Sequence, residues 1–179
     1  TRKESSAASD VYKRQDLEDQ DEEVARQVES EDMMKCEQIY HSLADKCQEE
    51  IYQYFETEKK KEGEFPRTRE VEDALLEVNW YMDLIRSKMK RALCGYFLYA
   101  DKINATQEEE DYNGSAKVTL LAVEISCTAW TVIRDNISDF EREASRMIVL
   151  LEQLENDIEA FFPNARTFKR PGFDTCDVV

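Results

Sequence analysis

The chain has 179 residues, of which 41% are apolar, and it carries a formal net charge of −16. This size fits one domain, and the apolar fraction is sufficient for a hydrophobic core. The acidic surplus excludes non-specific binding to nucleic acid or to an anionic membrane, because both are negatively charged. Four glycines and three prolines leave few places where helices must end, so long helices are expected.

The first 32 residues show little hydrophobic patterning. The string SSAASDVYKRQ at positions 5–15 resembles a recurrent artefact of translated sequencing-adapter DNA. We therefore expect residues 1–15 to be a non-native or disordered leader, with the native N terminus upstream. Residues 16–32 contain nine acidic residues and one basic residue, with only Val24 and Val28 as apolar anchors. They predict a weakly held start of the first helix.

Two long amphipathic helices are predicted next, over residues 33–61 and 70–103. In both, apolar side chains recur every three or four residues, which is the spacing of one helix face. The second helix has a wider apolar side than a two-stranded seam, so it is expected to contact at least two others. Gly63 and Pro66 separate the two helices. Gly95 lies within the second one, where we expect a neighbouring helix to approach closely; a functional kink is the alternative.

Aromatic side chains gather in the second predicted helix. They are Trp80, Tyr81, Tyr96, Phe97 and Tyr99. We expect them to pack in the core and at its boundary, because aromatic residues on an amphipathic helix bury large apolar areas there. A ligand pocket or an exposed interface is the alternative.

The second half of the chain begins with a polar connection over residues 104–115, which contains the turn pair Asn113-Gly114. Between residues 118 and 133 the only charged residue is Glu124, so this helix is predicted to be buried on all sides at the bundle centre. It is too short for a membrane span, which needs about 20 apolar residues. Glu124 then requires either solvent at an edge of the bundle or a charged partner.

The sequence gives conflicting signals around residue 138. Ser138 and Glu141 have capping-box spacing, which predicts a new helix start. The apolar spacing nevertheless continues unbroken from Trp130 to Phe161, which predicts one long helix. We favour the break, because a helix that is apolar all round needs neighbours on several sides. The predicted fold is all-α: an elongated antiparallel bundle of three to four long helices over residues 16–162.

Pro163 ends the last predicted helix, and residues 163–179 are expected to form an extended C-terminal tail. Part of this tail is locally basic, and aromatic residues alternate with its cations. We expect it to fold back on the acidic bundle; docking on a partner as an extended peptide is the alternative. The candidate partner-binding residues are Arg166, Phe168, Lys169, Arg170 and Phe173.

Patterns for catalysis and metal binding are scarce. His41 is the only histidine, which argues against a di-iron site and against nucleophile-histidine catalysis, and we expect it at the surface or boundary of the bundle. The glycines are isolated, so no phosphate-binding loop is predicted. We therefore expect a non-enzymatic protein without a cofactor, a metal or a small-molecule substrate. The five cysteines show no paired spacing and predict free thiols in a reducing, cytoplasmic compartment.

The wide apolar faces exceed what a three-helix arrangement covers, which predicts that other protein chains cover the remainder. We expect an interaction or scaffold protein that binds a protein partner or itself, as a subunit of a larger assembly or a homo-oligomer. One alternative is an acidic inhibitor that imitates nucleic acid and occupies a basic groove of another protein. A further alternative is a metal-dependent helical enzyme. Direct binding to nucleic acid or to a membrane is not expected.

Overall fold

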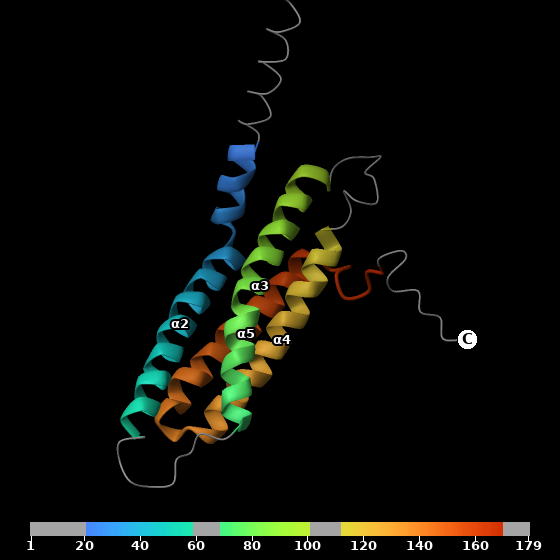
Figure 1. Ribbon diagram of the computed structural model, residues 1–179. Coiled ribbons are helices and arrows are strands. Elements are labelled where there is room, and N and C mark those ends of the chain that lie inside the picture. The colour runs from blue at the N-terminus through green and yellow to red at the C-terminus, as the bar shows by residue number, and fades with distance from the viewer. Residues whose placement is uncertain (1–20, 59–68, 101–111, 170–179) are drawn as a thin grey trace, which may run out of the picture.

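The computed structural model shows an elongated all-α bundle and describes residues 21–58, 69–100 and 112–169 (Figure 1). Within these three ranges there is no β-strand. A short helical segment covers 21–30, and a bend at Glu31 separates it from the first long helix. The further elements are α2 (Asp32–Glu58), α3 (Arg69–Tyr99), α4 (Tyr112–Asn136), the 3-10 helix η2 (Ser138–Phe140) and α5 (Glu141–Phe161).

The four long helices enclose one hydrophobic core. Each helix packs on two neighbours, in the cyclic order α2, α3, α4, α5, and helices that follow each other in the chain run antiparallel (Figure 1). The pair α3 and α4 is in the closest contact, whereas α2 is held less closely by α3 and α5. The predicted antiparallel bundle is confirmed, in its four-helix form.

Burial confirms the apolar spacing predicted for the second helix. Within α3, every apolar residue of that spacing from Val71 to Ala92 is at most 4% exposed. Burying a large apolar side chain stabilises a fold by about 1.5–3 kcal/mol, so this row anchors α3 in the core. The other helices add fully buried side chains, among them Tyr40, Phe55, Leu120, Trp130, Ile133 and Leu151.

The helix break near residue 138 is confirmed, but the predicted capping box is not formed. Ile137 has an extended backbone (φ −128°, ψ 91°), and no side chain caps η2 or α5. The chain turns through η2 instead, where the N–H of Phe140 donates to the carbonyl of Ile137 at 3.0 Å. Ile137 and Phe140 are only 2% and 9% exposed, so the turn itself fills the core. The apolar spacing therefore continues through a break in the helix.

One further predicted boundary is wrong, and several predicted segments lie outside the described residues. The connection was predicted to extend to residue 115, but α4 begins at Tyr112 and contains the predicted turn pair Asn113-Gly114. Gly114 and its neighbour Ser115 are buried, and this tertiary burial outweighs the turn preference of the pair. The segments outside the described residues are 1–20, with the predicted leader 1–15, and 59–68, 101–111 and 170–179.

The prediction that the apolar helix α4 is buried on all sides is wrong. Leu121 is 48% exposed, although Leu120 and Trp130 are fully buried. In a square arrangement each helix has two close neighbours, so one side of α4 faces outward. Among the described residues, only α4 is long and apolar enough to cross a membrane by length and composition, and half of its most apolar stretch is buried in the bundle. The core helix of a bundle has the same length and composition, so these properties are only weak evidence for a membrane span.

Gly95 has the role that its place in α3 predicted. A Cβ atom added at Gly95 would lie 2.9 Å from the Cβ atom of Tyr112, at the start of α4. Helix α3 continues through Gly95 without interruption. The close approach of α3 and α4 therefore explains this glycine, and a kink does not.

Gly95→Ala is expected to destabilise the bundle. Alanine normally gains about 1 kcal/mol over glycine inside a helix, but here its Cβ meets an atom next to the Tyr112 backbone, which moves only if α3 and α4 separate. Urea unfolding followed by circular dichroism should show a lower midpoint. Ser87→Ala, at an exposed site of the same helix, should not lower it. A midpoint above that of the wild type for Gly95→Ala would contradict the close approach.

Candidate interaction surface

A buried carboxylate lies in the seam between α2 and α3. The Glu37 side chain is 0% exposed, and Nε of Arg86 donates to both of its oxygens at 3.1 Å. The Arg86 side chain is 37% exposed, so its guanidinium group connects the buried charge to solvent. Glu37 needs this partner, because desolvation of an unpaired charge costs several kcal/mol.

His41 lies beside this pair, one turn further along α2. Its Nδ1 is 3.3 Å from Glu37 Oε1 and its Nε2 is 3.9 Å from Asp83 Oδ1, but Nδ1 makes no hydrogen bond to a described residue. The side chain is 18% exposed, which confirms the predicted boundary position. Glu37, His41, Asp83 and Arg86 thus form a polar cluster between α2 and α3. None of these four side chains is a nucleophile of the serine or cysteine type.

Sequence reasoning missed Glu37 as a core residue, because only apolar positions were used to trace the core. The signal was nevertheless present. Glu37 follows Met33 by four residues and precedes Tyr40 by three, and both of these neighbours are buried. A carboxylate at this spacing shares the inward face of the helix and requires a cation as its partner.

Further along the same seam, α2 and α3 enclose an open groove with a volume of about 810 Å³, which we call the α2–α3 groove. Seven of its lining residues come from α2 and one comes from α3. The α2 residues recur every three or four positions, so they form one stripe along the outer side of that helix. The lining residues are Asp45, Gln48, Glu49, Tyr52, Gln53, Glu56, Thr57 and Asn79.

The α2–α3 groove is acidic. Asp45, Glu49 and Glu56 supply three carboxylates, and no lysine or arginine is among the lining residues. Asp45 and Glu49 form no ion pair with any described residue. Gln48 is the one buried residue of the lining, at 5% exposure, and its Nε2 donates to Met82 Sδ at 3.8 Å. A thioether is a weak acceptor, so this amide is poorly satisfied.

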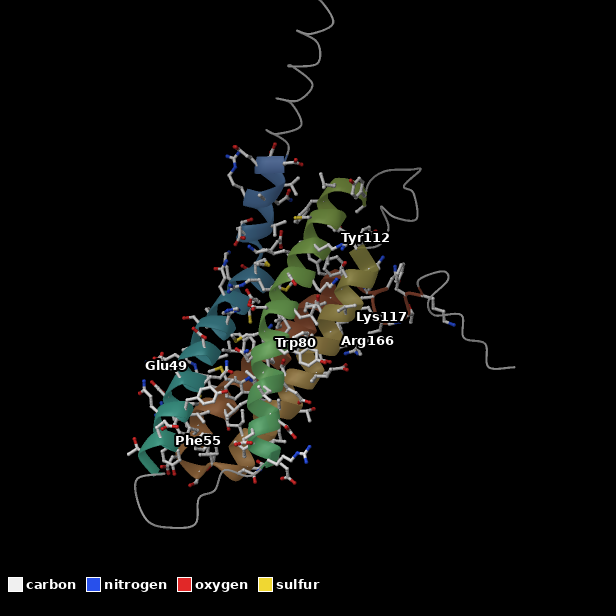
Figure 2. The ribbon with its side chains drawn as sticks, viewed as in Figure 1. Glu49, Phe55, Trp80, Tyr112, Lys117 and Arg166 are labelled. Carbon is white, nitrogen blue, oxygen red and sulfur yellow. The ribbon has the colours of Figure 1, made fainter. Side chains whose placement is uncertain are left out.

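Two large apolar side chains of α3 are close in sequence to Asn79, the residue of this helix that lines the groove. Trp80 is 73% exposed, and Leu76, one turn before it, is 63% exposed; we call them the Leu76/Trp80 face. Figure 2 shows Trp80 projecting outward from α3. The prediction that Trp80 packs in or beside the core is wrong. Trp80 is two residues from both Val78 and Met82, and two residues turn a side chain to the opposite side of a helix.

The other aromatic residues predicted for this helix are at least partly buried. Tyr81, Tyr96 and Phe97 pack against the core. The ring of Tyr96 meets that of Phe161 at 4.8 Å and that of Tyr112 at 5.8 Å, in edge-to-face arrangements. These contacts close the end of the bundle where α3, α4 and α5 meet. The Leu76/Trp80 face differs from these aromatic residues because its side chains are exposed.

Residues 163–169 fold back on the bundle, as the basic composition of the predicted tail indicated. Arg166 donates from Nη1 to Glu124 at 2.6 Å and from Nη2 to Glu155 at 2.5 Å, and its Nε pairs with Glu159. The hydrogen bonds with Glu124 and Glu159 raise the pKa of Arg166. The Glu124 side chain is 40% exposed and paired with Arg166. It therefore has both the solvent and the charged partner that were expected as alternatives for a carboxylate in this apolar helix.

The other predicted partner-binding residues are placed differently. Lys117 on α4, labelled with Arg166 in Figure 2, donates from Nζ to the carbonyl of Phe168 at 2.8 Å. Lys169 is exposed, and Arg170 and Phe173 lie outside the described residues. The structure therefore brings Arg166 and Phe168 against the bundle, and partner binding by the five residues stays a prediction.

The described cysteines are free thiols. They are Cys36, Cys47, Cys94 and Cys127. Burial raises the pKa of all four thiols, to about 12 for Cys47 and for Cys127. Because a thiolate is the reactive form of cysteine, these side chains are protonated and unreactive near pH 7.

The fold is expected to lose stability as the pH rises from about 9 to about 12. In this range the thiols of Cys47 and Cys127 stay protonated in the folded chain but ionise in the unfolded chain, which then binds fewer protons and is favoured. Below this range both states keep these protons. Urea midpoints measured across the range should decline less steeply in Cys47→Ala/Cys127→Ala. An unchanged slope in that variant would refute the role of the thiols.

Comparison of the chain with protein-family models, with curated proteins and with solved structures found no match. In the part of the chain that the structure describes, no group of three or more His, Cys, Asp or Glu side chains is placed to hold a metal ion. The candidate interaction surface consists of an acidic groove between α2 and α3 and of an exposed leucine and an exposed tryptophan on α3.

Proposed function

We propose that the protein is a non-enzymatic interaction or scaffold protein, which works as a subunit of a larger assembly or as a homo-oligomer. The observation that carries this proposal is the exposure of Trp80, together with Leu76 one turn away. Leaving such side chains in water forgoes about 25 cal/mol for each Å² of apolar area that a partner would cover. Tryptophan is also enriched among the residues that dominate protein–protein binding energy.

The alternative function, an acidic inhibitor that occupies a basic groove of another protein, is supported by a different observation. The carboxylates of Asp45 and Glu49 have no ion-pair partner among the described residues, so they are available to cations of another molecule. Binding of this kind weakens steeply as salt is added, because charge contributes most of its free energy. Burial of the Leu76/Trp80 face would instead persist in high salt.

Light scattering coupled to size exclusion tests the proposal on the full chain after native purification, in low and in high salt. We expect the wild type to elute with a second copy or with another protein in both. Leu76→Ser/Trp80→Ser should elute as a single free chain. Leu121→Ser/Val149→Ser removes exposed apolar side chains from α4 and α5 and should behave like the wild type. A wild type that is a single free chain at every concentration and salt would contradict the proposal.

A further inference from the structure

We propose that the α2–α3 groove binds a basic amphipathic helix of another protein. This inference rests on the proposed function and specifies the chemistry of the partner: lysine or arginine side chains for the acidic lining, and a row of large apolar side chains for the Leu76/Trp80 face. Three properties support it, namely the length of the groove, its charge and the exposed apolar side chains of α3.

The shape of the groove fits a helix. Its lining on α2 extends from Asp45 to Thr57, which corresponds to about 18 Å, or roughly three helical turns. Both walls are helices, whose backbone N–H and C=O groups are already paired within each helix. An extended peptide that adds to a sheet edge therefore has no backbone partners here, whereas a helix can bind in the groove through its side chains.

The charge of the groove selects a basic partner. Asp45 and Glu49 lack ion pairs with described residues, and no lysine or arginine is among the lining residues. Figure 2 labels Glu49 at the outer edge of α2 and Trp80 on α3. A chain with a net charge of −16 also attracts cations over a longer range, which raises the association rate.

The exposed apolar side chains require that the partner be amphipathic. Tyr52 lines the groove and is 43% exposed, and Leu76 and Trp80 on α3 are more exposed still. A helix that lies along the seam can place apolar side chains over these three residues only if they recur every three or four positions. The cations then fall on the neighbouring positions, above Asp45 and Glu49.

A second copy of this chain is a poorer occupant than a basic helix. A symmetric pair formed through this surface would bring the carboxylates of one α2–α3 groove against the same carboxylates of the other. Like charges that face each other across an interface oppose binding. Self-association through the groove is therefore an outcome that would overturn the inference.

Fluorescence anisotropy on the full chain tests the inference with three labelled synthetic peptides of about 14 residues, each roughly 21 Å long as a helix. The first carries leucine on one helical face and lysine or arginine on the other. The second has the same composition in scrambled order, and the third has glutamate in place of the cations. We expect the first to bind at least about tenfold more tightly than the second, and the third not to bind. Equal binding of the first two would overturn the inference.

Matched variants of the protein locate the binding. Glu49→Lys should weaken binding of the first peptide roughly five- to tenfold, because it places a cation against a cation. Glu152→Lys changes the net charge equally but lies on α5, so it should have little effect. Trp80→Ala should weaken binding about tenfold without a change in urea midpoint, which shows that the fold is intact. Equal losses for Glu49→Lys and Glu152→Lys would mean attraction by net charge alone and would overturn the inference.

The inference and the proposed function fail separately. If no peptide binds but the wild type still elutes with another protein or a second copy, the inference is wrong and the proposed function stands. If no peptide binds and the wild type is always a single free chain, both are wrong.

Discussion

Arg86→Met is expected to lower the free energy of unfolding by about 3 kcal/mol. The substitution leaves the Glu37 carboxylate completely buried without the guanidinium group that pairs with both of its oxygens. Breaking a buried ion pair by removing one partner typically costs 3–5 kcal/mol. We expect the lower end of that range, because the Arg86 side chain is 37% exposed and water reaches the site. Urea unfolding at pH 7 measures this loss.

Two further variants separate the loss of the ion pair from other effects. Glu37→Met/Arg86→Met removes both charges and should recover most of the loss, since replacing a buried pair with apolar side chains is often neutral. Arg69→Met removes an arginine from the same helix, where Arg69 is 92% exposed and lies 3.8 Å from Asp73. It should cost at most about 1 kcal/mol, as exposed ion pairs do. If Arg86→Met costs no more than Arg69→Met, Glu37 is not a buried charge.

Trp130→Ala is expected to cost about 3–5 kcal/mol, as is usual when a large aromatic side chain is removed from a core. Trp130 on α4 is 0% exposed, and its Nε1 donates to the hydroxyl of Tyr40 on α2 at 3.2 Å. The pair therefore connects two helices that face each other across the core. Tyr40→Phe keeps most of the volume but leaves the indole N–H without its acceptor, and should cost about 1–3 kcal/mol.

Trp80→Ala is the matched control for Trp130→Ala. It removes the same side chain from a position that is 73% exposed, and in the isolated chain it should change the free energy of unfolding by less than about 0.5 kcal/mol. Urea unfolding followed by circular dichroism gives both values. Similar losses for the two tryptophans would show that Trp80 is packed within the chain and would remove the main support for the proposed function.

The helices and the core were predictable because local spacing determines which side of a helix is apolar. The row from Val71 to Ala92 was identified in this way and is buried. The same rule was misleading where burial is not periodic. Ile137 and Phe140 keep the apolar spacing through a turn, and Asn113-Gly114 forms part of a helix because the start of α4 packs closely on α3.

The candidate site was less predictable, because it depends on which helices are neighbours. Glu37 lies in phase with the core, but its partner Arg86 is 49 residues away and is supplied by α3. The α2–α3 groove likewise combines a stripe of α2 with Asn79 of α3, and no single helix contains it. The helical position of Trp80 predicts the outer side, because it is two residues from the buried Val78 and Met82. Its hydrophobicity predicted the core instead.

Acrylamide quenching of tryptophan fluorescence tests most directly whether another protein molecule covers the outer side of α3. Trp130 is fully buried and provides the protected reference, so quenching reports on Trp80. We expect strong quenching of the dilute chain, and protection of Trp80 when the basic amphipathic peptide is added. Quenching of Trp80 that stays the same with the peptide present would contradict the interaction surface.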